Sequence, residues 1–232
     1  MNPIPKKTLN IALKIIIGLM LLSILSILIM RWVNPFGSML MLERKIVNWN
    51  ITQQQIWKDW DEISDNIKIA VMASEDQNFP KHWGFDFNAI SKALKYNQNN
   101  KKTRGASTIT QQVAKNIFLW PSRSWVRKGI EAWFTIWIEF IWSKQRILEI
   151  YLNYAEWGEG IFGIEAASRY YFHTSAKNLT LNQACLLAAI LPNPRNLSPS
   201  QPNKYTLNKA SWIQGQIINL NKTIYLKKLN TN

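Results

Sequence analysis

The sequence predicts a mainly α globular domain that follows one N-terminal transmembrane helix. Residues 11–31 are almost entirely aliphatic, and about 20 such residues are enough to cross ~30 Å of hydrocarbon. Beyond them, apolar residues recur at spacings of three and four, which is typical of helices. No convincing run of alternating apolar and polar residues predicts a strand. The 232 residues, 47% of them hydrophobic, suit one domain of ordinary size plus a short extra element.

The N-terminal apolar segment decides the compartment. It is followed by Arg31 and Trp32 rather than by the small residues of a cleavage site, which favours an uncleaved anchor over a signal peptide. Lys6, Lys7 and Lys14 precede or flank the span, so the positive-inside rule places the N-terminus in the cytoplasm. The predicted order is a cytoplasmic N-terminus (1–10), a transmembrane anchor (11–31), a membrane-proximal segment (32–54) and an outer domain (55–232). The apolar membrane-proximal segment is expected to be ordinary core or to touch the bilayer.

Helical spacing and capping residues place the elements of the outer domain. Asp86 and either Ser107 or Thr108 are good N-cap residues, and Pro192 ends the last apolar run. The segment 125–142 is apolar on nearly all sides, which predicts a buried central helix. The polar segment 97–104 is expected to be a mobile loop. Helices are predicted over residues 56–74, 87–96, 108–118, 125–142, 145–154, 163–171 and 180–191.

The composition restricts the partners. The chain carries 28 Lys+Arg against 14 Asp+Glu, a net charge of +14, which suggests a polyanion: nucleic acid, anionic lipid or a phosphorylated substrate. The outward topology argues against nucleic acid. Twelve Trp residues are typical of a protein at a membrane interface. The single cysteine, Cys185, excludes an intrachain disulfide and is expected to be a small buried hydrophobe.

The first polar cluster is Glu75 with Asp76 and His82. Two adjacent acids after the apolar run 69–73 are unusual at a helix end, where the helix dipole is negative. The acids are either a solvated helix terminus or carboxylates held at the edge of the core. In the second case Glu75 is available as a general base.

The second cluster runs from Gly105 to Gln112 and continues to Lys115. A glycine followed by hydroxyl residues at a helix start exposes backbone N–H groups, which is a ready site for an anion. Lys115 lies one turn beyond Gln111 and is expected to face the same ligand. The alternative is a plain helix cap with a polar face.

The third and fourth clusters are harder to separate from ordinary structure. Arg127 and Glu131 are four residues apart and share one helical face, as a surface ion pair would, but they open the most apolar helix of the chain. The segment 144–153 and the glycines that follow it are expected mainly to pack and to turn. Two carboxylates and several cations in one membrane-anchored domain suit transfer of a sugar off a phosphate leaving group.

At this point the chain resembles the peptidoglycan glycosyltransferases of family 51 in their monofunctional, membrane-anchored form. The resemblance rests on five ordered motifs within residues 55–200. They are Glu75-Asp-x-x-Phe79-x-x-His82-x-Gly84, Gly105-x-Ser-Thr-Ile-Thr-Gln-Gln112, Arg127-Lys-x-x-Glu131, Lys144-x-x-Ile-Leu-Glu149-x-Tyr-Leu-Asn153 and Leu187-Ala-Ala-Ile-Leu-Pro-Asn-Pro194. Gln183 departs from the acid expected before the last motif, away from the proposed chemistry. No transpeptidase domain is expected after the last motif.

The resemblance implies a lysozyme-like fold with a membrane-contacting small lobe, in the inner membrane of a Gram-negative cell. It implies polymerisation of lipid II onto a nascent β-1,4 glycan chain with release of undecaprenyl pyrophosphate, next to other cell-wall synthesis or division proteins. Glu75 is then the base, and Glu131 positions the donor pyrophosphate, directly or through a divalent cation (Mg²⁺ or Mn²⁺). Phosphate binding would fall to Lys115, Arg123 and Arg127. The residues that would shape the cleft are Asp76, Phe79, His82, Ser107, Thr108, Gln111 and Gln112.

Two other functions fit the same residues less well. A glycan-cleaving, lysozyme-type enzyme could use Glu75 as an acid, but it has no need of phosphate-binding cations. A membrane-tethered scaffold would need none of the acids. With only His82 and His173, far apart in sequence, no His-ligated metal site is expected.

Overall fold

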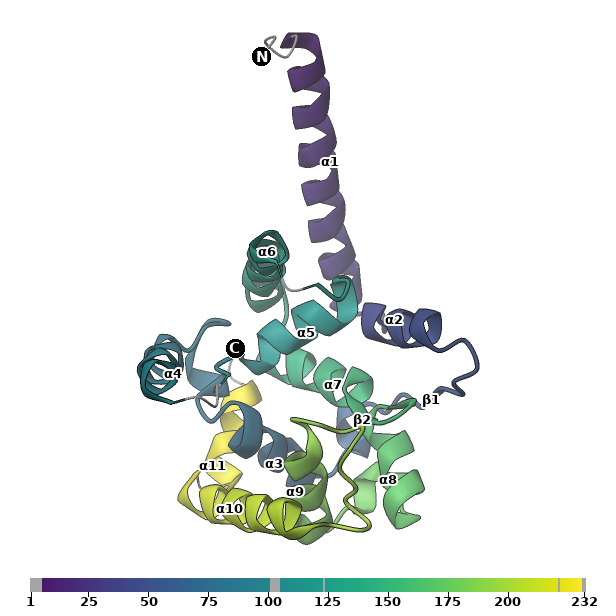
Figure 1. Ribbon diagram of the computed structural model, residues 1–232, viewed down its shortest axis with the longest axis vertical. Coiled ribbons are helices and arrows are strands. Elements are labelled where there is room, and N and C mark those ends of the chain that lie inside the picture. Colours follow the sequence, from purple (N-terminus) through teal and green to yellow (C-terminus); the bar gives the residue numbers. More distant parts are fainter. Residues whose placement is uncertain (1–5, 101–104, 123, 221, 231–232) are drawn as a thin grey trace. The chain divides into compact units, whose positions relative to one another are not determined.

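The computed structural model describes residues 6–100, 105–122, 124–220 and 222–230 (Figure 1). The chain forms two units, residues 1–36 and 37–232. The first holds α1 (Lys6–Met30), and its segment Lys7–Met30 is, within the described part of the chain, the one helix long and apolar enough to cross a membrane. The helix begins before residue 11, where the sequence placed the start of the anchor, and it is consistent with a single-pass anchor.

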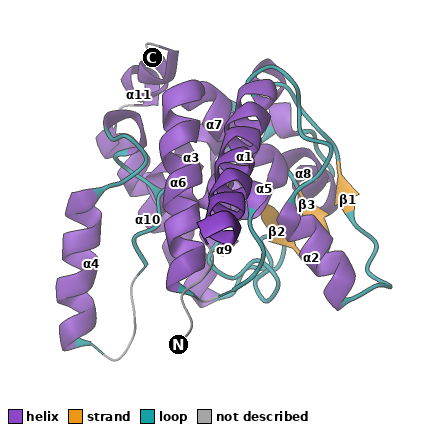
Figure 2. Ribbon diagram, turned by 90° about the horizontal axis from the view of Figure 1, so that it is seen from above, coloured by secondary structure: helices purple, strands orange, loops and turns teal. Residues whose placement is uncertain are grey.

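The second unit is mainly helical, as predicted (Figure 2). Its α-helices are α2 (Met39–Val47), α3 (Asp65–Glu75), α4 (Phe87–Asn99), α5 (Ile109–Phe118), α6 (Trp125–Ile141), α7 (Lys144–Tyr154), α8 (Ile164–Phe172), α9 (Leu181–Ile190), α10 (Lys204–Leu220) and α11 (Lys222–Lys227). Short 3₁₀ turns are η1 (Trp60–Glu62), η2 (Phe79–Lys81), η3 (Ala176–Asn178) and η4 (Lys228–Asn230). The strands are β1 (Gln54–Gln55), β2 (Glu156–Gly158) and β3 (Ile161–Phe162).

The capping residues act as the sequence predicted. Asp86 Oδ1 accepts from the Ala89 N–H at 2.9 Å and starts α4. Thr108 starts α5 with a reciprocal capping box, and Thr180 starts α9 in the same way. Helix α4 continues to Asn99, so the start of the polar segment expected to be a loop is helical; residues 101–104 lie outside the described part.

The predicted helix 56–74 begins too early. Helix α3 starts at Asp65, where the Ser64 side chain accepts from the Asn66 N–H. Upstream, backbone N–H groups are bonded to side chains of α7 instead of to a preceding turn: the Lys58 N–H donates to Asn153 Oδ1 at 2.8 Å, and the Trp60 N–H donates to a Glu149 carboxylate oxygen at 2.7 Å. Tertiary partners therefore replace the helical ones in this segment.

The expectation of no strands is also wrong, because a small sheet of order β1-β3-β2 is present. β1 is parallel to β3, and β2 is antiparallel to it. Each strand has two or three residues, which is too short to show an alternating pattern. At the turn before β3, Gly160 has φ +72°, and a Cβ there would lie 2.6 Å from the Thr52 carbonyl oxygen.

The expectation that residues 125–142 form a buried central helix is wrong, because one side of α6 is exposed. Its buried residues are Glu131, Thr135, Ile138 and Glu139, whereas Trp125 is 91% and Phe140 is 74% exposed. The polar stripe faces the domain and much of the apolar surface faces outward. A pattern that is apolar on nearly all sides does not reveal which side is covered.

The core lies where α9 packs against α3 and α10, and where α5 packs against α6 and α7. In α9, residues 184–190 are all buried, including Cys185 as predicted. Helix α10 was not predicted, nor were α2 and α11. Helix α4 stands apart from these packed helices in both views (Figures 1 and 2).

Candidate active site

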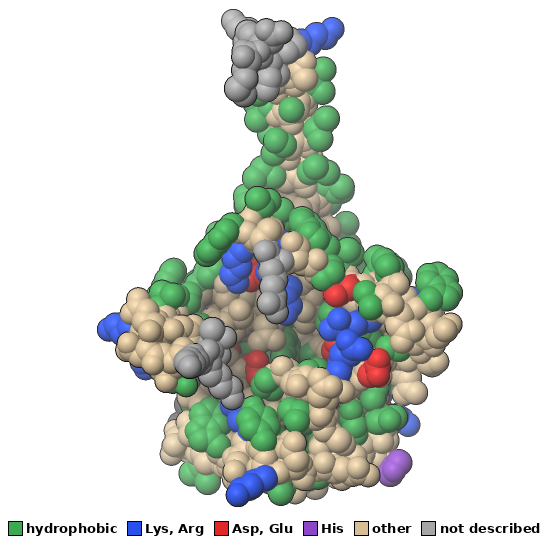
Figure 3. All heavy atoms as spheres, viewed as in Figure 1, with side chains coloured by type: hydrophobic (Ala, Val, Ile, Leu, Met, Phe, Trp, Pro, Cys, Tyr) green, Lys and Arg blue, Asp and Glu red, His purple; other side chains and the backbone are tan. Residues whose placement is uncertain are grey.

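A cleft of about 640 Å³ opens at the C-terminal end of α3. Its walls are the end of α3, the start of α4, the segment that leads into α5, and one side of α10. The lining residues are Ala73, Ser74, Glu75, Asp76, Gln77, Asn78, Asp86, Asn88, Ala89, Lys92, Gly105, Ala106, Ser107, Thr108, Gln112, Pro192, Tyr205, Lys209 and Trp212. On the face shown in Figure 3, Lys, Arg, Asp and Glu side chains surround a hollow in the domain.

Glu75, the last residue of α3, is held on the cleft wall by neutral donors. Gln112 Nε2 donates to Glu75 Oε2 at 3.0 Å, and the Ser74 hydroxyl lies 3.3 Å from Glu75 Oε1. The Tyr151 hydroxyl donates to Gln112 Oε1 at 3.3 Å, which turns the amide nitrogen toward the carboxylate. Burial raises the pKa of Glu75; Gln112 and the positive charge of Lys209 lower it in part. Glu75 is therefore a carboxylate with increased basicity that remains accessible from the cleft.

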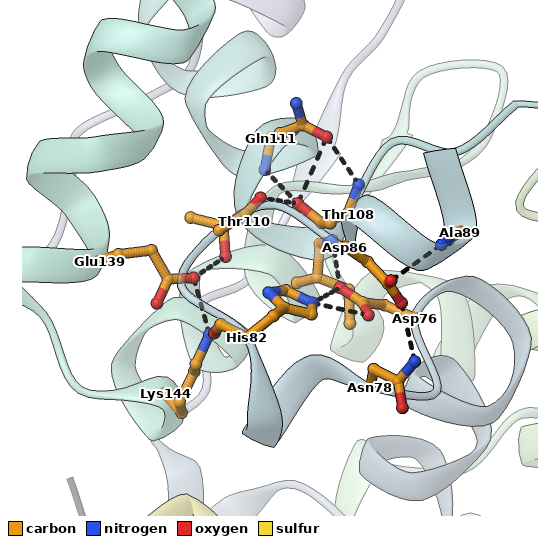
Figure 4. Close-up of polar contacts among 12 residues, drawn as sticks. Asp76, Asn78, His82, Asp86, Ala89, Thr108, Thr110, Gln111, Glu139 and Lys144 are labelled. Carbon is orange, nitrogen blue, oxygen red and sulfur yellow. Dashed lines mark hydrogen bonds and ion pairs between the residues drawn. The ribbon is translucent and has the colours of Figure 1, made fainter. Parts of the chain in front are cut away.

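Asp76, beside it, has a different environment. The carboxylate is buried and accepts from the backbone N–H of Ile109, the first residue of α5, at 3.1 Å. His82 Nε2 lies 2.9 Å and 3.0 Å from the two Asp76 oxygens. Asp76 thus joins the end of α3 to the start of α5, with a negative charge at the positive end of the helix (Figure 4). Both adjacent acids line the cleft but differ: Glu75 is partly exposed there, whereas Asp76 is buried and joins two helices.

A second buried network supports the loop before α4. The Thr108 hydroxyl donates to the Gly84 carbonyl oxygen at 2.7 Å. Lys144 donates to the His82 carbonyl oxygen and to Glu139 Oε1, both at 2.7 Å, and its ammonium lies 4.6 Å from the Phe79 ring centroid. Figure 4 shows these side chains converging from α5, α6 and α7. The network fixes the loop that carries His82 and Gly84 next to the cleft.

A cationic cluster lies where α5 meets α6. Glu131 is buried; Arg127 Nη1 donates to its Oε2 at 2.8 Å, and Lys128 donates to its Oε1. Burial lowers the pKa of Lys115, and the nearby charge of Glu131 raises it in part. The Arg127–Glu131 pair is therefore not an ordinary surface ion pair: the two side chains are 13% and 4% exposed.

Helix α5 links this cluster to Glu75. Gln112 contacts Glu75, and Lys115 lies three residues further along the same helix, a rise of about 4.5 Å. One helix therefore presents the partner of the carboxylate and a member of the cationic cluster about one turn apart.

The predicted site residues fall into four groups. Those that line the cleft are Glu75, Asp76, Ser107, Thr108 and Gln112. Phe79, His82 and Gln111 lie behind it, and Gln111 is the capping-box partner of Thr108 rather than a cleft residue. Lys115, Arg127 and Glu131 form the cationic cluster with Lys128. Arg123 lies outside the described residues.

Sequence reasoning missed the α10 side of the cleft. Tyr205, Lys209 and Trp212 line it. Their spacing of four and three along a helix was a readable signal, but no helix was predicted there. Glu139 was also missed, because its partners lie on other helices.

Comparison with known proteins shows the family to which the chain belongs. The transglycosylase family model matches residues 43–217. A biosynthetic peptidoglycan transglycosylase of Pseudomonas fluorescens is 53% identical over 221 residues, 94% of this chain and 92% of the relative. One of Chromohalobacter salexigens is 52% identical over 228 residues, 97% of each chain. The chain belongs to this transglycosylase family, as a peptidoglycan glycosyltransferase of cell-wall biosynthesis with a mainly α, lysozyme-like domain.

Proposed function

We propose that the enzyme polymerises lipid II into β-1,4-linked glycan strands and releases undecaprenyl pyrophosphate. The observation that carries this proposal is the α5 link between Glu75 and the cationic cluster. A glycosyl transfer from a lipid pyrophosphate needs a base at the attacking hydroxyl and positive charge at the leaving group, a short distance apart.

In the proposed reaction, Glu75 takes the proton of the acceptor sugar's 4-hydroxyl. The hydroxyl oxygen forms a bond to the anomeric carbon of the donor as the bond from that carbon to the pyrophosphate oxygen breaks. Burial favours this step, because the raised pKa makes Glu75 a stronger base. The negative charge that develops on the pyrophosphate is stabilised by Lys115, Arg127 and Lys128.

Glu131 is assigned a positioning role. Both of its oxygens accept hydrogen bonds from cations, so Glu131 aligns Arg127 and Lys128. Within the described residues, no group of three or more His, Cys, Asp or Glu could hold a metal ion. No step of the proposal uses a divalent cation, because Arg127 and Lys128 already place positive charge beside Glu131. Activity that persists in EDTA is the expected result.

The test of the reaction is Glu75→Gln in the full-length protein with purified lipid II. Polymer formation should fall by roughly 10²–10⁴-fold, the usual contribution of a general base. Glu62→Gln is the control, because Glu62 belongs to an exposed ion pair with Lys58. Near-normal polymer from the Glu75 variant would remove Glu75 from the reaction.

We also propose the membrane arrangement that goes with this substrate. The N-terminus is cytoplasmic and the catalytic domain periplasmic, in accordance with the positive charges of Lys6, Lys7 and Lys14 in the N-terminal part of α1. The outward apolar side of α6, with Phe140 and Trp125, touches the bilayer where the lipid substrate resides. An environment-sensitive dye on Phe140→Cys should shift to shorter wavelength in liposomes. The same dye on Leu207→Cys should not, and the buried Cys185 leaves the labelling specific.

A further inference from the structure

The α10 wall of the cleft carries a stripe of residues that none of the five motifs contains. Tyr205, Lys209, Trp212 and Gln216 recur at spacings of four, three and four, so they share one face of the helix. The neighbouring face holds the buried residues Thr206, Ala210, Ile213 and Ile217 and packs the helix onto the domain. The stripe is therefore fixed in place beside the cleft.

Three residues of the stripe, Tyr205, Lys209 and Trp212, line the same cleft as Glu75. Gln77, which lines the cleft two residues after Glu75, donates from Nε2 to Gln216 Oε1 at 3.2 Å. Lys209 lies close enough to Glu75 for its charge to lower the carboxyl pKa. A ligand that occupies this cleft beside Glu75 can therefore contact the α10 side chains.

The side chains of the stripe are of the kinds that bind a saccharide. Tyr205 is 49% and Trp212 is 44% exposed, and both line the cleft, so part of each ring is open to a ligand. Such amphipathic rings suit a sugar, whose ring faces carry C–H groups and whose edges carry hydroxyls. Lys209 Nζ lies 4.1 Å from the Trp212 ring centroid, which holds a positive charge next to the aromatic surface.

The cleft also has cations of its own. Lys209 lines one wall and Lys92, from α4, another, whereas Lys115, Arg127 and Lys128 do not line the cleft. The cleft therefore has a separate place for an anionic group that is not the leaving pyrophosphate. The peptide-bearing sugars of peptidoglycan supply such a group, because their peptides carry carboxylates.

We propose that the α10 stripe is the subsite for the peptide-bearing sugar of the acceptor. Tyr205 and Trp212 pack against the saccharide, and Lys209 pairs with a carboxylate of its peptide. This inference rests on the proposed function, because it takes the cleft beside Glu75 as the acceptor side.

The first experiment measures KM and kcat of the full-length protein with lipid II. Trp212→Ala and Tyr205→Ala should each raise KM about tenfold, which corresponds to ~1.4 kcal/mol, and should change kcat little. Leu207→Ala is the matched control, since Leu207 is 49% exposed on α10 but does not line the cleft. Unchanged KM in both aromatic variants would overturn the proposal that Tyr205 and Trp212 pack against the saccharide.

The second experiment tests whether Lys209 pairs with a carboxylate of the substrate's peptide. Lys209→Met should raise KM about fivefold on lipid II and leave KM unchanged on lipid II whose peptide carboxylates are amidated. The assay is run on the pH plateau, because Lys209, Asp76 and Tyr151 all interact with the charge of Glu75. Lys204→Met, on the exposed side of α10, is the control. An equal rise on both substrates would overturn the assignment of Lys209.

A binding measurement separates failure of this inference from failure of the proposed function. A soluble disaccharide-peptide is titrated against full-length Glu75→Gln protein, with and without Trp212→Ala. The inference expects weaker binding in the Trp212 variant even if no lipid II is polymerised. Equal binding would refute the subsite, whether or not the wild-type protein makes glycan.

Discussion

Lys144→Met tests whether the buried network behind the cleft holds the fold together. The Lys144 and Glu139 side chains are each 4% exposed, and their ammonium and carboxylate are 2.7 Å apart. Methionine fills nearly the same space but removes the charge, so Glu139 would keep its hydrogen bond from the Thr110 hydroxyl but lose its positively charged partner. The His82 carbonyl oxygen would also lose its donor.

The expected loss of folding stability follows from the burial of both Lys144 and Glu139. Removing one member of a buried ion pair typically costs about 3–5 kcal/mol, because the remaining charge is left without compensation. For a domain of this size, 1 kcal/mol changes the unfolding midpoint by about 2–4 °C. We therefore expect the midpoint of Lys144→Met to fall by roughly 6–20 °C.

The midpoint is measured by thermal unfolding of the detergent-solubilised protein, with Trp fluorescence as the signal. Lys204→Met, at an exposed position of α10, should leave the midpoint nearly unchanged. Lys144→Met/Glu139→Gln should recover most of the loss, because the amide removes the uncompensated charge and still accepts from Thr110. A midpoint for Lys144→Met equal to that of the Lys204 control would refute the reasoning. A double variant as unstable as Lys144→Met would refute the electrostatic part of it.

Three further variants test other parts of the structure by thermal unfolding. Gly84→Ala should destabilise the domain by about 1–3 kcal/mol, because Gly84 has φ +77° and an added Cβ would lie 2.6 Å from Thr135 Cγ2; an unchanged midpoint would contradict this geometry. Glu75→Gln should raise the midpoint at pH 7.5. Because the folded pKa of Glu75 is raised, folding is favoured while the carboxyl is protonated, and this contribution is lost as pH rises through the folded pKa. The difference should vanish below the ordinary carboxyl pKa of 4.5, and a difference that persists there would show another cause. Arg44→Gln should cost about 1.5–3 kcal/mol, because Arg44 Nε and Nη2 donate to the nearly buried Glu156 carboxylate at 3.0 and 2.9 Å; a loss no larger than that of an exposed arginine would contradict this pairing.

The sequence predicted the elements whose ends carry local signals. Asp86, Thr108 and Thr180 are side-chain caps, and each defines a helix start within a few residues. Helix α3 was placed too early, because the spacing of Ile56, Trp60 and Ile63 resembles a helix that tertiary hydrogen bonds from α7 prevent. A strand of two residues has no periodicity to detect, and its pairing with β3 is a long-range event.

For the site, the sequence motifs predicted Glu75 as the base and Lys115, Arg127 and Glu131 at the pyrophosphate, and the structure brings the last three together. The motifs could not show that Asp76 accepts a hydrogen bond from the start of α5 while Glu75 accepts one from Gln112. These partners come from another helix, so they depend on how the helices pack and not on the local sequence. The α10 stripe was missed for a different reason. Its residues are ordinary singly, and only the packing of α10 against α3 and α9 brings them beside Glu75.

The wrong expectation of a buried α6 and the proposed chemistry have the same cause, which is the polar side chains on the inward face of this helix. Its inward stripe is polar because Glu131 and Glu139 serve the cationic cluster and the Lys144 network. Its apolar residues, with Phe140 and Trp125 among them, are consequently left on the outside. In water that arrangement exposes apolar side chains, and in the proposed membrane arrangement a bilayer covers them. The proposed function gives the reason: an enzyme that takes its substrate from a membrane can turn the polar side of a helix inward, where we propose that the pyrophosphate binds.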